Sequence, residues 1–263
     1  MKTIFSIIFV SAFITVFSQK FELKDSVLIE NKTIKSIDTD LNNSIYLISN
    51  TRIEKIFQSK KNKRIDLKNI ITSVDVNNPL RAYVYSNFNQ LTILDEDLNP
   101  IQDIVKIKSN DFMPAALKVV DTQFCWFYDL IGNKIVYYNY QLQKPILTSK
   151  QIYLKHNDQS IDKIHVYKNL VYLKGHKTIY VYDDYGNFKS NFEFDTNQQP
   201  FYFYKDVILY INDNKLISKN IINQNLTTFI DLENVKSFAL SEKNLYTLVE
   251  NKIYTYTILS TND

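Results

Sequence analysis

The sequence predicts an all-β protein, a six-bladed β-propeller with four antiparallel strands in each blade. Three observations lead to this prediction. Short segments rich in β-branched and aromatic residues are separated by Asn, Asp, Lys or Gly, and no helical stripe competes with them. A turn followed by an apolar alternating segment also recurs along the chain. Six units of about forty residues are typical of a propeller whose blades have four strands.

The repeat is clearest where a turn such as Asn-Lys precedes an apolar strand. Six apolar anchor residues follow such turns at intervals of 37 to 44 residues: Ile53, Leu91, Ile135, Ile179, Leu216 and Ile253. The fourth unit divides most cleanly into an inner strand over 163–167, a second over 170–173, a third over 179–182 and an outer strand over 188–194.

The two ends of the chain are expected to share one blade. The sixth unit has strands over 235–240, 245–249 and 252–258, and then the chain stops without an outer strand. An extended segment over 21–29 precedes the first inner strand, expected at 33–38, and belongs to no unit. We therefore predict that the N-terminal strand completes the last blade, which removes two free sheet edges.

Residues 1–18 are predicted to be a secretory signal peptide. Lys2 precedes an apolar run over 4–17, and Val16-Phe17-Ser18 offers a cleavage site before Gln19. An uncleaved anchor is the alternative, but the run is shorter than the about 20 residues of a membrane span. A lipoprotein would need a cysteine at the cleavage point. We expect residues 19–263 to form a single propeller domain, exported to the periplasm or beyond, with no transmembrane segment after cleavage.

Composition excludes several classes of function. Lys and Arg number 31 against 28 Asp and Glu, and the basic residues are scattered, so we expect no nucleic-acid partner. Three glycines are too few for glycine-rich phosphate loops, and one cysteine excludes a disulfide framework. Asparagine at the strand junctions is expected to take over the left-handed turn positions that glycine usually fills.

The segments over 73–80 and 87–95, together with the signal peptide and the six weak units, resemble small exported six-bladed β-propeller proteins of Bacteroidota with an NHL-like propeller shape. The resemblance covers nearly all of the mature chain, but only the second unit carries a distinctive stretch. These proteins are largely without assigned function. The resemblance therefore implies a fold and a compartment and brings no catalytic or cofactor-binding residues.

Acidic residues on the inner strands give the candidate metal site. Six-bladed propellers that act as lactonases or esterases place such side chains around a central calcium. Asp38, Asp75 and Asp121 occupy related places in the first three units, with Asp40 just beyond the first, and could converge at one mouth of the channel. The competing interpretation, which we favour, is that each Asp bonds backbone amides at a turn.

Other candidate chemistry is weaker. His156, His165 and His176 could hold zinc, but they are expected at different radii and heights of the fourth blade. Cys125 lies in an apolar strand and is expected to be a buried, inert thiol. The many Tyr and Phe are expected to pack between blades rather than bind a sugar or a partner. The basic cluster over 60–64 is expected to be a solvated outer turn of the first blade.

The sequence thus favours an exported, non-enzymatic binding or scaffold module for protein–protein interaction in a bacterial envelope. The partner is unidentified, and we expect a monomer. The alternative is a calcium-dependent, lactonase- or esterase-like hydrolase that uses the inner-strand acids at the channel mouth.

Overall fold

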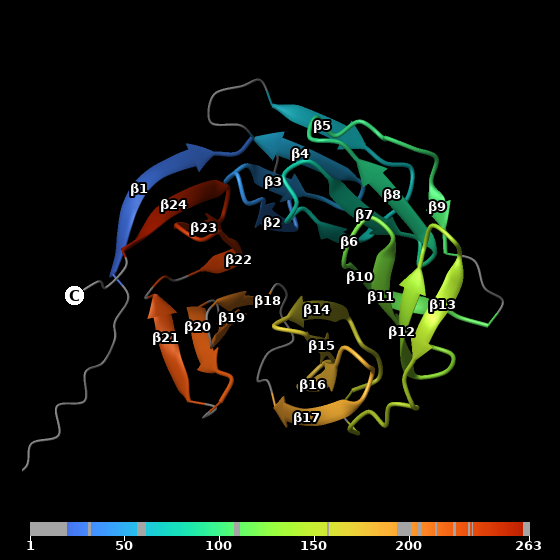
Figure 1. Cartoon of the computed structure of the whole chain (residues 1–263). Helices are drawn as coiled ribbons and strands as arrows, with labels where there is room; N and C mark the ends of the chain where they lie inside the picture. The colour runs from blue at the N-terminus through green and yellow to red at the C-terminus, as the bar shows by residue number, and fades with distance from the viewer. Residues whose placement is uncertain are drawn as a thin grey trace, which may run out of the picture.

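The computed structural model describes residues 20–30, 33–56, 62–107, 111–156, 158–193, 201–204, 207–213, 215–222, 225–230, 232 and 234–259. They form six sheets of four antiparallel strands each, arranged as a ring of blades (Figure 1). The described residues contain strands and turns without helices, and so no helix that could cross a membrane. The predicted six-bladed β-propeller is confirmed. The predicted signal peptide, residues 1–18, lies outside the described residues.

Within each blade the strands follow one another from the channel outward. Blade 1 holds β2 (Ser36–Thr39), β3 (Ile45–Ile48), β4 (Arg52–Ile56) and β5 (Lys63–Asp66). Blade 2 holds β6 (Ile71–Asp75), β7 (Ala82–Ser86), β8 (Gln90–Leu94) and β9 (Val105–Lys106). Blade 3 holds β10 (Pro114–Val119), β11 (Phe124–Asp129), β12 (Lys134–Asn139) and β13 (Lys144–Thr148).

The second half of the chain repeats this plan. Blade 4 holds β14 (Lys163–Tyr167), β15 (Leu170–Lys174), β16 (Thr178–Asp183) and β17 (Phe188–Glu193). Blade 5 holds β18 (Phe201–Tyr204), β19 (Val207–Asn212), β20 (Lys215–Asn220) and β21 (Leu226–Ile230). Blade 6 holds β22 (Val235–Leu240), β23 (Asn244–Val249), β24 (Lys252–Leu259) and, from the other end of the chain, β1 (Lys20–Leu28).

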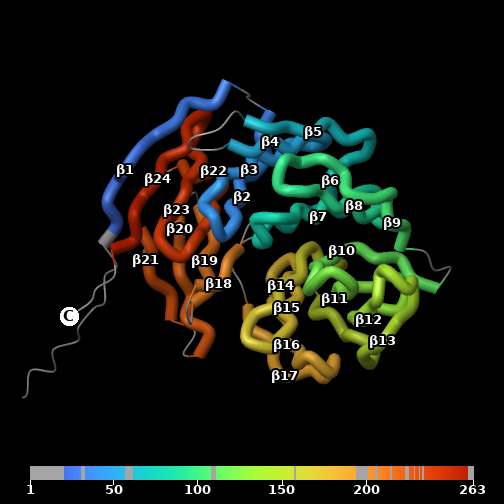
Figure 2. Tube along the Cα trace, turned by 45° about the horizontal axis from the view of Figure 1, so that its top comes forward, coloured from blue at the N-terminus to red at the C-terminus, as the bar shows by residue number. Residues whose placement is uncertain are grey.

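The ring is closed by the N-terminal strand, as predicted. β1 pairs antiparallel with β24, from Lys20 opposite Leu259 to Leu28 opposite Lys252 (Figure 1, blue beside red). The tube view shows the same two strands side by side at the edge of blade 6 (Figure 2). Closure with strands from both ends of the chain holds the first and last blades together through backbone hydrogen bonds.

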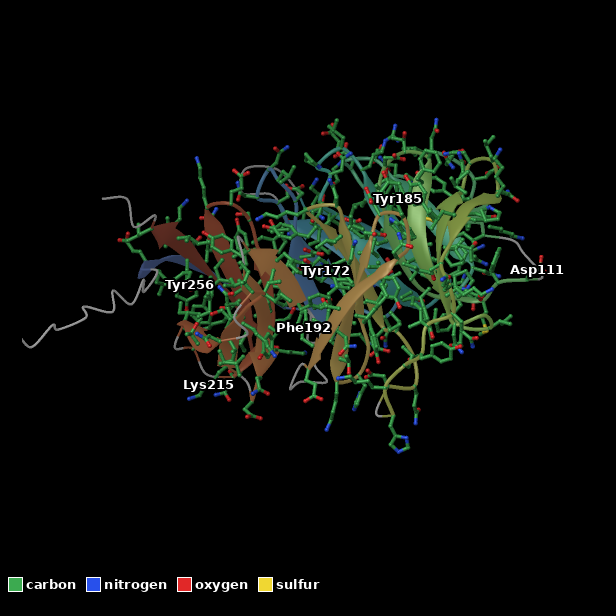
Figure 3. All side chains as sticks on the ribbon, turned by 60° about the horizontal axis from the view of Figure 1, so that its bottom comes forward. Asp111, Tyr172, Tyr185, Phe192, Lys215 and Tyr256 are labelled. Carbon is green, nitrogen blue, oxygen red and sulfur yellow. The ribbon has the colours of Figure 1, made fainter. Side chains whose placement is uncertain are left out.

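Six hydrophobic clusters, one between each pair of neighbouring blades, make up the core. All six predicted anchor residues lie on the third strand of a blade and are fully buried in these clusters or beside them. Tyrosines fill much of the same space, and the side-chain view shows Tyr172 within the packed interior (Figure 3). The predicted packing role of the aromatic residues is confirmed for these positions.

Strand boundaries and turns mostly follow the predictions. β14 spans the predicted inner strand, whereas the first inner strand is shorter than expected and begins at Ser36, because residues 33–35 form the turn and loop that enter blade 1. Asparagine provides five of the eleven non-glycine residues with positive φ in the described chain: Asn43, Asn87, Asn133, Asn169 and Asn234. These junction asparagines take the left-handed conformation as predicted.

Candidate functional site

The inner strands of the six blades line a central channel, and the described residues enclose a cavity toward each end of it. A cavity of about 210 Å³ is lined by residues near the ends of the inner strands, such as Asp75, Val166 and Phe203; we call it the strand-end cavity. A second cavity of about 260 Å³ is lined by residues near their starts, such as Ser36 and Ile71; we call it the strand-start cavity. The inner strands therefore run in one direction, from one face of the ring to the other.

Four residues belong to both linings and mark the boundary between the cavities: Asp38, Val74, Lys163 and Tyr202. They come from β2, β6, β14 and β18, so the boundary is assembled from four blades. The phenol of Tyr202 donates a hydrogen bond to Asp38 Oδ1 at 2.8 Å, across the ring between blades 5 and 1. The backbone N–H of Thr39 donates to the same oxygen at 2.9 Å.

The second carboxylate of the strand-end cavity has a partner of its own. Asp75 Oδ2 forms an ion pair of 2.5 Å with Lys118 Nζ, on the inner strand of blade 3, and the Asn77 backbone N–H donates to Asp75 Oδ1 at 3.3 Å. The ammonium of Lys163, by contrast, makes no hydrogen bond or ion pair with any described residue. Its nitrogen lies 5.7 Å from the centre of the Tyr202 ring and 6.0 Å from that of Phe201.

Burial shifts the pKa values of the ionisable groups in this channel. Burial raises the pKa of Asp38, an effect that nearby Lys163 and the bond from Tyr202 oppose. Burial lowers the pKa of Lys163, and it lowers the pKa of His165 well below 6.5, helped by the charges of Lys163 and Lys118. A low-dielectric channel disfavours each charged form in this way.

His165 lies on an aromatic wall formed by blades 4 and 5. Its ring is 4.3 Å from the Phe201 ring and 5.7 Å from the Phe203 ring, measured between centroids. Tyr167 and Phe203 stack at 5.1 Å with an interplanar angle of 14°. The Nε2 atom of His165 is buried and has no hydrogen-bond partner in the part of the chain that the structure describes. The strand-end cavity thus has a charged side and an aromatic side.

The structure brings two of the three predicted metal residues into one cavity. Asp38 and Asp75 line the strand-end cavity, but Asp121 does not. Asp121 Oδ1 instead accepts hydrogen bonds from the backbone N–H groups of Gln123 at 2.7 Å and Phe124 at 2.8 Å, the predicted turn role. Among the described residues, no group of three or more His, Cys, Asp and Glu is arranged to hold a metal ion. A calcium bound by the remaining two carboxylates stays a prediction.

The other predicted candidates are also separated from one another. His165 lies in the channel, while His156 and His176 line a solvent-exposed hollow with Asp162 on blade 4, so two of the histidines are closer together than expected. Cys125 is fully buried, and burial raises the pKa of its thiol, which confirms an unreactive setting. Of the basic cluster, residues 60 and 61 lie outside the described chain, and Lys63 and Arg64 lie on the outer strand β5.

Sequence reasoning missed Lys118 and Tyr202 as channel residues. Lys118 could have been found, because it is the single charged residue of the otherwise apolar strand β10. Tyr202 gave no such signal, since it stands in a run of four aromatic residues, Phe201–Tyr204.

A second feature lies on the face from which the inner strands start, which we call the strand-start face. Each blade presents two segments there: the residues just before its inner strand, and the turn between its second and third strands. In blades 2 and 3 these segments carry exposed apolar side chains: Ile70, Phe88, Met113, Leu130 and Ile131. We call these five residues the apolar patch.

Backbone hydrogen bonds join the segments within each blade of the patch. The Asn87 N–H donates to the Ile70 carbonyl at 3.4 Å in blade 2, and the Leu130 N–H donates to the Met113 carbonyl at 2.9 Å in blade 3. In blades 1, 4 and 6 the corresponding described positions are polar or glycine: Lys35, Asn50, Thr51, Asp162, Gly175, His176, Lys177, Asn234, Glu250 and Asn251. The apolar character is therefore a local property of blades 2 and 3.

Comparison with known proteins supports the fold. No protein-family model matches the chain, and no curated protein matches its sequence. Among solved structures, a streptogramin B lyase superposes with a TM-score of 0.64 at 11% identity, over 91% of this chain and 98% of the other. Virginiamycin B lyase from Staphylococcus aureus gives 0.61 at 12%, over 91% and 100%. BamB from Moraxella catarrhalis gives 0.57 at 10%, over 91% and 100%. At such identities the likeness establishes a β-propeller and nothing more specific.

Proposed function

We propose that this chain is a non-enzymatic binding module that docks a protein partner on the apolar patch of blades 2 and 3. The observation that carries the proposal is the concentration of five exposed apolar side chains on two adjacent blades of one face, with polar residues at the described equivalents elsewhere. Ile70 is 67% exposed and Ile131 is 65% exposed. Contiguous apolar surface rimmed by polar residues is typical of a protein-binding site.

The patch is held in place before any partner arrives. The carboxylate of Asp129 is buried and accepts hydrogen bonds from the backbone N–H groups of Met113 at 2.8 Å, Ile131 at 3.2 Å and Gly132 at 2.8 Å. One side chain thus fixes both segments of blade 3. A rigid surface loses little conformational entropy on binding, which favours affinity.

Phe88 has a strained backbone conformation, and a role in binding would explain why phenylalanine stands there. Asn87 and Phe88 have φ of 50° and 54°, and the Asn89 N–H closes the turn onto the Ser86 carbonyl at 3.4 Å. Such turns favour Asn or Gly at both central positions, so a half-exposed phenylalanine is unfavourable there. Strained residues persist most often where function requires the side chain.

We also propose that the protein is exported and acts in a bacterial envelope. The signal-like segment over 1–18 supports export, and the resemblance to NHL-like propellers of Bacteroidota supports a place in a bacterial envelope. A protein-binding role also suits a propeller, whose turns are displayed on a rigid ring.

Site-specific photo-crosslinking in the native host tests the docking surface. A photoreactive amino acid at position 131 should give a discrete heterologous adduct, and the same probe at position 176, in the equivalent turn of blade 4, should give none. Purified wild-type protein should compete with the adduct, whereas an Ile70→Asp/Ile131→Asp variant should not. Equal adducts from both positions, or equal competition by both proteins, would show that the patch is not the docking surface.

The variant Phe88→Asn separates binding from folding. Because Asn accepts positive φ readily, we expect its free energy of unfolding to rise by about 0.5–1 kcal/mol, measured by urea denaturation. The adduct at position 131 should nevertheless weaken. A loss of stability would show that Phe88 is not strained in the wild type. An unchanged adduct would show that Phe88 does not contribute to docking.

A further inference from the structure

We propose that the strand-end cavity binds one small carboxylic acid with an aromatic or other apolar body, through Lys163 and His165. This site shares no residue with the apolar patch, because its two binding residues lie on β14 of blade 4, whereas the patch lies on blades 2 and 3. The two faces of the ring are separated in the side-chain view: Tyr185, in the turn after β16, and Lys215, the first residue of β20, lie toward opposite faces (Figure 3).

The positive charge that would receive the ligand is that of Lys163. The cavity lining holds two carboxylates and two ammonium groups. Asp75 is paired with Lys118, and Asp38 accepts from Tyr202 and Thr39. This leaves Lys163 as the lining cation without a hydrogen bond or ion pair among the described residues. A cation in a low-dielectric channel gains most from an anion that approaches it closely.

His165 supplies the second donor. Lys163 and His165 are two residues apart on β14, so their side chains project from the same face of the strand. Nε2 of His165 is buried and has no hydrogen-bond partner among the described residues, and a buried polar atom without a partner is unfavourable. An ammonium and an imidazole N–H side by side match the two oxygens of one carboxylate.

The aromatic wall beside His165 and the remaining apolar lining fit an apolar body. Tyr167, Phe203, Val74 and Leu240 line the same space as the charged groups. A flat ring can pack against the stacked Tyr167–Phe203 pair, since offset and edge contacts between rings are favourable. At about 210 Å³ the cavity is smaller than the roughly 300–1,000 Å³ of drug-sized sites, so the ligand must be small.

The charge of the lining favours a monoanion over phosphate. Asp38 and Asp75 share the cavity with Lys163, and both would repel a second negative charge. Phosphate also has more acceptor oxygens than Lys163 and His165 can satisfy. A carboxylate places a single negative charge on two oxygens, which is what these two donors can accommodate.

Titration calorimetry with a matched set of probes tests this site. Phenylacetate should bind the purified mature protein, whereas its uncharged analogue phenylacetamide, acetate and inorganic phosphate should each bind at least tenfold more weakly. Lys163→Met should lose at least tenfold in affinity for phenylacetate, and His165→Phe severalfold. Lys35→Met, on the lining of the other cavity, should bind as the wild type does.

Two results would overturn the proposal. The first is that the wild type does not bind phenylacetate, or that Lys163→Met binds it as tightly as the wild type does. Circular dichroism and the melting temperature must show that the variant is folded. The other is phosphate binding as tight as that of phenylacetate, which would indicate nonspecific anion attraction. Should Lys163→Met fail to fold, the imidazole resonances of His165 in the wild type give the same answer: phenylacetate should shift them and phenylacetamide should not.

Discussion

Replacing His165 with phenylalanine should flatten the pH dependence of stability below pH 6.5. In the folded chain, burial and two nearby lysines lower the pKa of His165 well below the 6.5 of an unfolded histidine. Below pH 6.5 the unfolded chain therefore takes up a proton that the folded chain does not. The stability that the neutral, buried ring contributes is complete above pH 6.5 and is lost as the pH falls.

The size of this effect follows from proton linkage. A histidine that is protonated only in the unfolded state removes up to about 1.4 kcal/mol of stability for each pH unit below its unfolded pKa. In a protein of this size, 1 kcal/mol shifts the melting temperature by about 2–4 °C. Because an unfolded histidine is already half protonated at pH 6.5, the wild type should lose about 1 kcal/mol, or about 2–4 °C, more than His165→Phe between pH 6.5 and about 5.5.

Phenylalanine is the right replacement because the imidazole ring already packs between rings. Phe201 and Phe203 lie 4.3 and 5.7 Å away, so a phenyl group keeps these contacts and removes the unpartnered Nε2. Differential scanning calorimetry of the two proteins across this pH range measures the slopes. His156→Gln, which replaces an exposed histidine, serves as the control and should keep the wild-type slope. Identical slopes for wild type and His165→Phe would refute a buried, neutral His165.

Three further expectations concern the fold and the channel. Lys55→Met removes the ammonium that lies 3.3 Å from the buried Asp40 carboxylate and should cost about 3–5 kcal/mol in urea unfolding, against under about 1 kcal/mol for Arg52→Met on an exposed pair. Gly132→Ala puts a Cβ 2.6 Å from Asp129 Oδ2 and should cost about 1–3 kcal/mol; an unchanged unfolding midpoint would contradict this. If two channel carboxylates bound calcium, adding it should raise the melting temperature and EDTA should lower it; equal melting curves would argue against calcium.

The fold could be predicted because its determinants repeat. Each anchor residue fills the wedge between two blades, and the six positions obey the same steric requirement, so they reappear as Ile or Leu at similar intervals. Ring closure by β1 could also be deduced, since an extended segment was left over at one end and a strand was missing at the other. Individual boundaries were less predictable where a loop carries buried apolar residues, as Ile34 does before β2.

The channel was only partly predictable. Asp38 and Asp75 were recognisable as acids on inner strands, but their partners Tyr202 and Lys118 come from other blades, and no local pattern links residues so distant in sequence. Asp121 was ambiguous for a related reason, and the structure shows the turn role that the sequence favoured. An Asp that follows an inner strand can face the channel or fold back onto its own turn, and the sequence is the same in both cases.

The residues proposed to bind a ligand or a partner are therefore found at positions that differ from blade to blade. The six anchor positions are alike because the packing between blades tolerates little variation. The channel positions lie outside that packing and differ from blade to blade: Asp38, Asp75, Lys118, His165, Tyr202 and Leu240. The same holds on the strand-start face, where apolar residues interrupt an otherwise polar series on blades 2 and 3 alone among the described positions. Since the fold does not require either departure, and Phe88 and His165 each add a cost to it, both are best explained by the ligand and the partner proposed for them.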